Sequence, residues 1–186
     1  NLSELQRFDK SNSLGYFYTH FTNYLGFEFF DEYKVMGLAP YGDCQRYQHI
    51  FRECYTLYDS GLYSIEQEKY SIIHNICPKR LPHEPINQIH KDLAAALQYT
   101  LENIVMHLLL HFRNLTGLNN LSMAGGVAHN SKLIYEVINS KLFDRVFVHP
   151  ASADNGLPIG SALLCHNENC NDNFKLKNVY IGNNIG

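Results

Sequence analysis

The chain has 186 residues, 45% of them apolar, and its 15 Lys and Arg against 18 Asp and Glu give a formal net charge of −3. This length predicts one globular domain, and 13 Tyr and 11 Phe side chains supply a sizeable core, which excludes disorder of the whole chain. No basic cluster is longer than Lys79–Arg80, so nothing neutralises a run of phosphates, and no nucleic-acid partner is expected.

The first 42 residues are rich in aromatic side chains and interrupted by glycines, which predicts short helices or strands joined by tight turns. Further on, the pattern of Leu57–Tyr63 predicts two short strands around a turn at Asp59–Gly61. Three prolines, Pro78, Pro82 and Pro85, then stop regular structure before the next element.

The clearest predicted helix runs from Asn87 to Leu115, where apolar residues recur in steps of three and four. Asn87 is suited to cap its start, and Gly117 is suited to end it. Its apolar stripe is wide, so we expect burial against a sheet. Its most apolar window, Ile104–Phe112, is interrupted by two histidines and is shorter than the roughly 18 residues of a membrane span. No transmembrane helix and no membrane partner are therefore expected.

Two strand–turn–helix units follow in close succession. Their predicted strands, turns and helices are, in order, Leu121–Ala124, Gly125–Gly126, Asn130–Ser140, Val146–His149, Ala151–Gly156 and Leu157–Cys165. Strands that alternate with helices predict an α/β fold with a largely parallel sheet. The Asn-rich stretch 166–186 is expected to be a surface tail or the start of a linker to a second domain.

The cysteines and the N-terminus bear on compartment and completeness. The five cysteines are an odd number without a CxxC or zinc spacing, so free thiols and a cytoplasmic location are expected. The chain starts with Asn instead of Met and has neither a basic nor an apolar leader region. We therefore expect it to be cut from something longer.

Gly125–Gly126 stands where a predicted strand gives way to a helix. Two glycines at such a point permit a tight turn and let backbone N–H groups approach a ligand, so one interpretation is a nucleotide or phosphate cradle. From the Gly-Gly pair alone, the plain turn described next is the preferred interpretation. The alternative is a turn that needs glycine only for its backbone angles. The chain has neither a GxGxxG nor a GxxxxGK[ST] motif, which leaves dinucleotide-binding and P-loop hypotheses without direct support.

Asp154 and Asn155 lie at the carboxyl end of the next predicted strand, the sheet edge at which α/β folds bind ligands. Asp154 is suited to a metal ion, and Asn155 is suited to a nucleotide or phosphate. The alternative is an ordinary Asp-Asn-Gly turn. His149, at the same strand end, is a further candidate ligand.

Lys34 is a single basic residue among apolar and glycine neighbours, suited either to a phosphate or carboxylate or to a solvated surface. His107 and His111 are four residues apart on the long helix, a spacing that can hold a metal. Their surroundings are apolar and no Glu stands between them as in HExxH, so a structural role is preferred.

Several segments carry a resemblance to a known family, namely Ser13–Gly15 with Tyr18 and Thr22, Leu25–Phe27, Glu32–Gly42, Ala95 with Gln98 and Glu102, Ala124–Val127 with Asn130, and Pro150 with Asp154 and Gly156–Ala162. In this order they resemble the ATP-dependent O-carbamoyltransferases of antibiotic and nodulation-factor biosynthesis. Glu32–Gly42 is the most specific segment. Tyr180–Gly182 also resembles the motif that follows the domain in that family.

The resemblance implies an α/β fold of the actin-like ATPase (ribonuclease H-like) kind, with a mixed sheet flanked by helices. Residues 1–165 would be mainly its second half. It also implies a reaction in which carbamoyl phosphate and ATP give a carbamoyl-adenylate. The carbamoyl group then passes to an acceptor with a free hydroxyl, in a site with a divalent metal, iron or magnesium.

The resemblance assigns roles residue by residue. Gly125, Gly126 and Asn130 match the loop that contacts the nucleotide, and Asp154 matches an aspartate that helps bind the metal. Lys34 and Glu32 match a segment near the acceptor or phosphate, which makes them the catalytic candidates.

The chain also departs from the family. There, an HxxxH pair and an aspartate upstream of Ser13 also hold the metal, and this chain begins after them. His107 and His111 copy the HxxxH spacing downstream, so the role is not transferred to them. The first half of the fold and the domain that makes the carbamoyl-adenylate are absent too, so these missing parts of the parent chain are expected partners.

Two alternatives remain beside the enzyme fragment: a non-catalytic nucleotide-binding module and an actin-like small-molecule kinase. A kinase of this fold is expected to have its own phosphate loops and a catalytic Asp, which the sequence does not show. An HxxxH segment upstream in the parent protein would separate the enzyme from the non-catalytic module.

Overall fold

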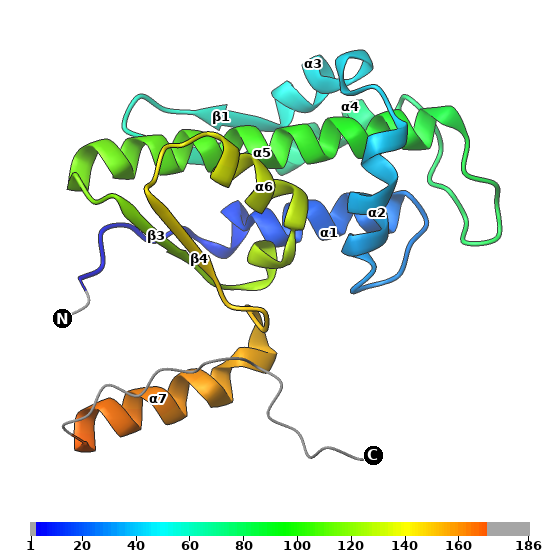
Figure 1. The fold of residues 1–186 in the computed structure, drawn as a ribbon. Coiled ribbons are helices and arrows are strands. Elements are labelled where there is room, and N and C mark those ends of the chain that lie inside the picture. The colour runs from blue at the N-terminus through cyan, green and yellow to red at the C-terminus, as the bar shows by residue number, and fades with distance from the viewer. Residues whose placement is uncertain (1–2, 171–186) are drawn as a thin grey trace, which may run out of the picture.

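The computed structural model describes residues 3–170. One long helix, α5 (Gln88–Thr116), runs along the molecule, and the other elements except helix α7 (Leu157–Asn169) gather around it (Figure 1). At its start, the His90 ring accepts a hydrogen bond from the Asn87 N–H at 3.0 Å, and Gly117 ends it with φ of 67°. The predicted helix and both of its end signals are confirmed.

By length and composition, α5 also qualifies as a membrane-spanning helix, which the sequence-based expectation had not allowed. However, 56% of its most apolar window is buried inside the protein, and the core helix of a soluble protein passes the same test. The absence of a membrane partner stays a prediction.

The N-terminal segment is helical throughout its regular parts. Helix α1 (Leu14–Tyr24) begins at Ser13, whose hydroxyl oxygen accepts from the Tyr16 N–H at 3.3 Å. Helix α2 (Glu32–Leu38) continues into the 3₁₀ turn η2 (Ala39–Tyr41). Short helices, and not strands, therefore account for the aromatic and glycine-rich start of the sequence.

The two residues after η2, Gly42 and Asp43, pack closely against the first turns of α5. A Cβ atom on Gly42 would lie 2.0 Å from the Lys91 carbonyl oxygen, so only glycine fits this close approach. Next to it, Asp92 is 1% exposed and its Oδ1 accepts from the Asp43 N–H at 2.8 Å. These contacts fix α2 relative to α5.

A β-hairpin lies on the other side of α5 from helix α6 (Ser131–Asn139) (Figure 1). Strands β1 (Tyr55–Leu57) and β2 (Tyr63–Ile65) pair antiparallel, which confirms the two predicted strands. The His107 ring Nε2 lies 3.0 Å from the Tyr58 carbonyl oxygen, and a Cβ atom on Gly61 would collide with the His111 ring. The two histidines therefore hold the hairpin turn against α5.

The second sheet consists of β3 (Asn120–Met123) and β4 (Arg145–Val148), which run parallel. Helix α6 (Ser131–Asn139) follows β3, and helix α7 (Leu157–Asn169) follows β4, which confirms the two strand–turn–helix units. Within residues 3–170, the fold is thus a mixed α/β arrangement with two small sheets flanked by helices.

Helix α7 lies apart from the body of the protein, and none of its residues is buried (Figure 1). It continues to Asn169, four residues beyond its predicted end. The rest of the predicted tail, 171–186, and the Tyr180–Gly182 motif lie outside the described residues.

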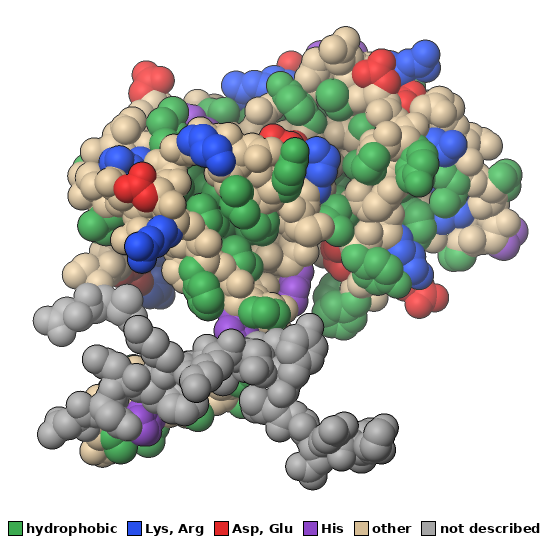
Figure 2. Space-filling model, viewed as in Figure 1, with side chains coloured by type: hydrophobic (Ala, Val, Ile, Leu, Met, Phe, Trp, Pro, Cys, Tyr) green, Lys and Arg blue, Asp and Glu red, His purple; other side chains and the backbone are tan. Residues whose placement is uncertain are grey.

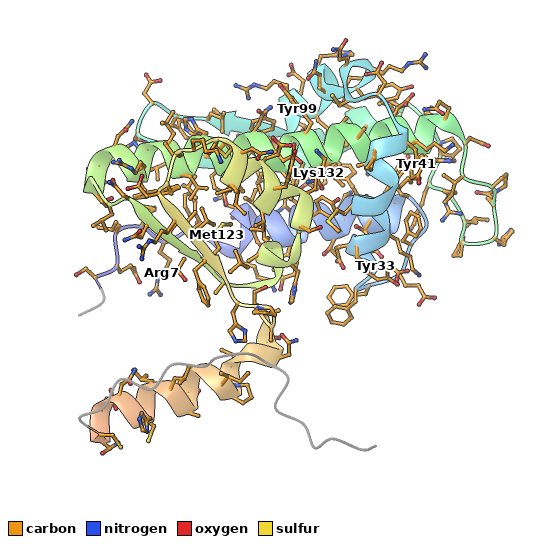
Figure 3. The ribbon with its side chains drawn as sticks, in the orientation of Figure 1. Arg7, Tyr33, Tyr41, Tyr99, Met123 and Lys132 are labelled. Atoms are coloured by element: carbon orange, nitrogen blue, oxygen red, sulfur yellow. The ribbon has the colours of Figure 1, made fainter. Side chains whose placement is uncertain are left out.

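The expected burial of α5 against a sheet is confirmed only in part. Its main neighbours are the helices α1, α2, α3 (Gln48–Phe51) and α6 and the 3₁₀ turns η2 and η3 (Cys44–Arg46), and the two sheets add residues such as Tyr55 and Leu121 to the same core. A wide apolar stripe shows that a face is buried without showing what covers it. Figure 3 labels Met123 of β3, which is half-buried and adds to the edge of the same core.

The remaining short elements connect these parts. They are η1 (Lys10–Asn12), η3 (Cys44–Arg46), α3 (Gln48–Phe51), η4 (Arg52–Cys54), η5 (Gln67–Lys69), α4 (Tyr70–His74), η6 (Gly126–His129) and η7 (Asp154–Gly156). All five cysteines are free thiols, as the sequence predicted.

Candidate functional site

The two turns that follow β3 and β4 are joined by a backbone hydrogen bond. The Gly125 N–H donates to the Ser152 carbonyl oxygen at 2.7 Å. Because β3 and β4 are parallel, both turns leave the sheet at the edge formed by the carboxyl ends of the strands, where α/β folds bind ligands. The structure therefore brings the Gly125–Gly126 turn and the turn containing Asp154 and Asn155 together.

The structure explains a glycine at one of the two positions of the first turn, Gly125, but not at the other, Gly126. Gly125 has φ of 99°, a backbone conformation that favours glycine. Gly126 has no positive φ, and a Cβ atom there would meet nothing within 4 Å. Neither backbone angle nor packing within residues 3–170 explains a glycine at position 126, whereas close approach by a ligand would explain it.

Unpaired backbone donors lie in the Gly125–Gly126 turn, which we call bare because no side chain of the described residues covers Gly126. The N–H groups of Gly126 and Val127 begin η6, and neither has an acceptor in the described part of the chain. Unpaired N–H groups beside a glycine turn are suited to the oxygens of a phosphate. The geometry is compatible with a phosphate cradle at Gly125–Gly126, the interpretation that the Gly-Gly pair alone did not favour, and the cradle stays a prediction.

Asp154 and Asn155 are both exposed at the start of η7. Within residues 3–170, no three His, Cys, Asp or Glu side chains lie close enough together to hold a metal ion. The residues present therefore do not form a metal centre by themselves. A role for Asp154 as a metal ligand stays a prediction.

The Asn130 side chain is hydrogen-bonded to other residues of the protein. Its Oδ1 accepts from the Leu133 N–H at 2.9 Å, which caps α6, and from Gln98 Nε2 at 3.0 Å. Its Nδ2 donates to Gln98 Oε1 at 2.9 Å. The two carboxamides thus pair reciprocally and fix the segment after the glycine turn to α5.

This pair belongs to a larger polar network that sequence reasoning did not foresee. The Tyr18 hydroxyl donates to Gln98 Oε1 at 3.0 Å, and Gln98 Nε2 donates to Glu102 Oε1 at 2.8 Å. Burial raises the pKa of the Tyr18 hydroxyl and of the Glu102 carboxyl. The only signal in the sequence was the family resemblance, which included Tyr18, Gln98, Glu102 and Asn130 without showing that they meet.

Lys34 and Glu32 lie on α2, and their side chains have partners of their own. Lys34 Nζ lies 2.8 Å from Asp31 Oδ1, and this contact raises the pKa of the lysine. Glu32 Oε1 accepts from the Thr19 hydroxyl of α1. Figure 3 shows the neighbouring Tyr33 at the end of α2 that is remote from η2.

In the described residues, one side-chain hydrogen bond connects α2 to the start of α6, the helix that follows the Gly125–Gly126 turn. The Ser131 hydroxyl, at the start of α6, lies 3.6 Å from Met36 Sδ. In the described residues, no hydrogen bond or ion pair joins the side chain of Lys34 or Glu32 to the turns after β3 and β4. The structure therefore groups Gly125, Gly126, Asp154 and Asn155, and it places the two catalytic candidates on an adjacent element.

This combination defines a class: an α/β domain whose parallel strands end in bare, joined turns suited to phosphate groups. Residues 3–163 match the family described as the carbamoyltransferase N-terminus. The chain therefore belongs to the carbamoyltransferase family.

Two nodulation proteins are similar over almost the whole chain. NolO of Bradyrhizobium diazoefficiens is 43% identical over 189 residues, a match that covers 100% of this chain and 34% of that protein. NolNO of Sinorhizobium fredii is 42% identical over 186 residues, which cover 98% of this chain and 27% of that protein. An uncharacterized protein of Synechocystis is 32% identical over 165 residues, covering 82% and 27%. The chain thus spans about a third or less of the curated relatives that it matches.

Proposed function

We propose that the protein to which this chain belongs is an ATP-dependent O-carbamoyltransferase, which uses carbamoyl phosphate and ATP to carbamoylate an acceptor hydroxyl through a carbamoyl-adenylate. In this proposal, the chain is mainly the second half of an actin-like ATPase domain. Membership of the carbamoyltransferase family supports the reaction type. The observation that carries the nucleotide role is the bare Gly126 backbone beside the joined turns.

The residues of the turns would act by binding and positioning. The unpaired N–H groups of Gly126 and Val127 would donate to phosphate oxygens of ATP, and Asn155 would add a carboxamide at the same sheet edge. Asn130 would act indirectly, because its carboxamide is paired with Gln98 and holds the turn in place.

On α2, Lys34 is the proposed cation for a phosphate or carboxylate. In the present geometry its ammonium group is paired with Asp31, and its side chain is 45% exposed. Engagement with substrate would require Lys34 to exchange this carboxylate for the substrate anion. Glu32, held by Thr19, would orient the acceptor side of the site.

The test uses the full-length parent protein with ATP, with and without carbamoyl phosphate, and follows release of AMP and pyrophosphate. We expect release only when carbamoyl phosphate is present. ATP consumption that is indifferent to carbamoyl phosphate would contradict the proposal and favour a kinase or ATPase. ATP binding without any turnover would favour a non-catalytic nucleotide-binding module.

A further inference from the structure

His149, at the end of β4, presents a buried donor that has no acceptor. Its ring Nδ1 accepts a hydrogen bond from the Ala151 N–H at 3.0 Å. In a neutral imidazole the other nitrogen then carries the proton, so Nε2 is a donor. His149 Nε2 is buried and has no hydrogen-bond partner in the described residues.

Ser152 repeats this situation three residues later. The residue is 7% exposed, and its hydroxyl is buried without a partner in the described part of the chain. Its own carbonyl oxygen is the acceptor for Gly125, so the backbone of Ser152 is held directly against the glycine turn. The loop after β4 therefore carries two unsatisfied side-chain donors beside the candidate site.

Such an arrangement is costly in the free protein. A buried donor without an acceptor costs about 1–3 kcal/mol, and most buried polar groups in proteins are paired. Within residues 3–170, buried atoms without a hydrogen bond also occur at Thr22 on α1 and at Asp92 and Arg113 on α5, but Asp92 Oδ2 is ion-paired with Arg46 at 3.5 Å, and Asp92 and Arg113 lie 21 positions apart. The loop after β4 instead combines two such donors with the bare Gly125–Gly126 turn.

We propose that His149 Nε2–H and Ser152 Oγ–H donate to a phosphoryl oxygen of a substrate bound at the Gly125–Gly126 turn. The N–H groups of Gly126 and Val127 and the His149 Nε2–H can only donate, and the Ser152 hydroxyl can donate as well, so together they favour an oxyanion. This inference rests on the proposed function and extends it, because it assigns two further substrate-binding residues. The phosphoryl group belongs either to ATP or to carbamoyl phosphate.

Two substitutions in the full-length parent protein isolate the donors. His149→Asn keeps an oxygen that can accept from the Ala151 N–H in an Asx turn and removes the distal donor. Ser152→Ala removes only the hydroxyl. The matched controls are His83→Asn and Ser60→Ala, which change an exposed histidine and an exposed serine far from the turns in sequence.

Calorimetric titration with ATP, carbamoyl phosphate and inorganic phosphate, each alone, measures affinity for the anion. We expect each variant to bind at least one of the three probes about tenfold more weakly than the wild-type protein, with both controls unchanged. Weaker binding of ATP alone would assign the donors to the nucleotide, and weaker binding of carbamoyl phosphate alone would assign them to that substrate.

Unfolding without ligand separates a binding role from a structural one. Because Ser152→Ala removes an unsatisfied buried hydroxyl, we expect the unfolding midpoint of the free protein to stay the same or rise. A lower midpoint with unchanged affinity for all probes would overturn the inference, as would failure of the wild-type protein to bind any probe. Selective loss of affinity in a protein without carbamoyl-phosphate-dependent turnover would support the donors and contradict only the proposed function.

Discussion

Arg80 and the loop after β4 bury polar side chains in opposite ways. The guanidinium of Arg80 is 5% exposed and donates to five backbone carbonyl oxygens, including that of Glu84 at 2.7 Å. His149 Nε2 and Ser152 Oγ, in contrast, are buried without any acceptor in the described residues. The guanidinium nitrogens of Arg80 are therefore all paired within the protein. The buried donors of the loop after β4 are unpaired within residues 3–170, which is the pattern expected where a ligand supplies the acceptor.

The two regions also differ in how deeply their residues are buried. The first half of α5 is almost entirely buried among the helices of the N-terminal region. Strands β3 and β4 alternate exposed and half-buried residues, and α7 buries none. On the face of the body drawn in Figure 2, hydrophobic side chains lie at the surface among charged ones. We thus assign stability mainly to the region around α5, and the proposed ligand binding to the region of β3 and β4.

The largest expected effect comes from breaking the self-contained region at Arg80. Arg80→Met should destabilise the protein by about 4 kcal/mol, because several buried carbonyls each lose a charged donor. Urea unfolding measures this change. Arg7→Met, at a side chain that is 80% exposed, is the control and should change stability by less than about 0.5 kcal/mol. Equal effects of the two substitutions would contradict the assignment of Arg80.

Two glycines of the most specific sequence segment should respond with opposite signs. Gly42→Ala places a methyl group 2.0 Å from the Lys91 carbonyl oxygen and should cost about 1–3 kcal/mol. Gly37→Ala meets nothing within 4 Å inside α2 and should stabilise the protein by up to about 1 kcal/mol. Chemical denaturation measures the free energy of unfolding of both variants. If Gly42→Ala stabilised the protein, Gly42 would not lie as close to the Lys91 carbonyl oxygen of α5 as described.

The smallest expected effect is a pH dependence in the self-contained region. His20 of α1 and His74 of α4 face each other with their Nε2 atoms 3.3 Å apart, and burial lowers the pKa of both rings. The unfolded chain therefore binds more protons below the ordinary value of 6.5, so stability should decrease as pH falls through and below that value. Lys79 lowers the pKa of His20 further.

His20→Phe keeps a ring against Tyr70 and removes one titrating group. The decrease in urea midpoint between neutral and mildly acidic pH should become smaller in this variant. An unchanged pH dependence would show that the histidine pair is not responsible.

The sequence predicted those features of the fold that depend on local pattern. Apolar spacing and the end signals Asn87 and Gly117 are local, and they located α5 correctly. The sequence did not predict that helices α1, α2, α3 and α6 cover most of its buried face, because packing between distant segments is a tertiary property. For the same reason, the role of Gly42 depends on Lys91, 49 positions away, and cannot be inferred from its neighbours.

The candidate site was predictable to a similar extent. Strand ends located the turns with Gly125 and Asp154, because parallel strands bring their carboxyl ends to one edge. The pairing of Asn130 with Gln98 joins residues 32 positions apart and has no local signature. The missing partners of Ser152 depend on burial, so only the structure shows them.

The central claim is that the bare backbone at Gly126 receives a phosphate group. The most direct test measures ATP affinity of the full-length protein carrying Gly126→Val, with Gly160→Val on the exposed α7 as the control. We predict about tenfold or greater loss of ATP affinity for Gly126→Val, no loss for the control, and no lower unfolding midpoint, because the added side chain occupies open space. Unchanged ATP affinity in the Gly126→Val protein would contradict the account.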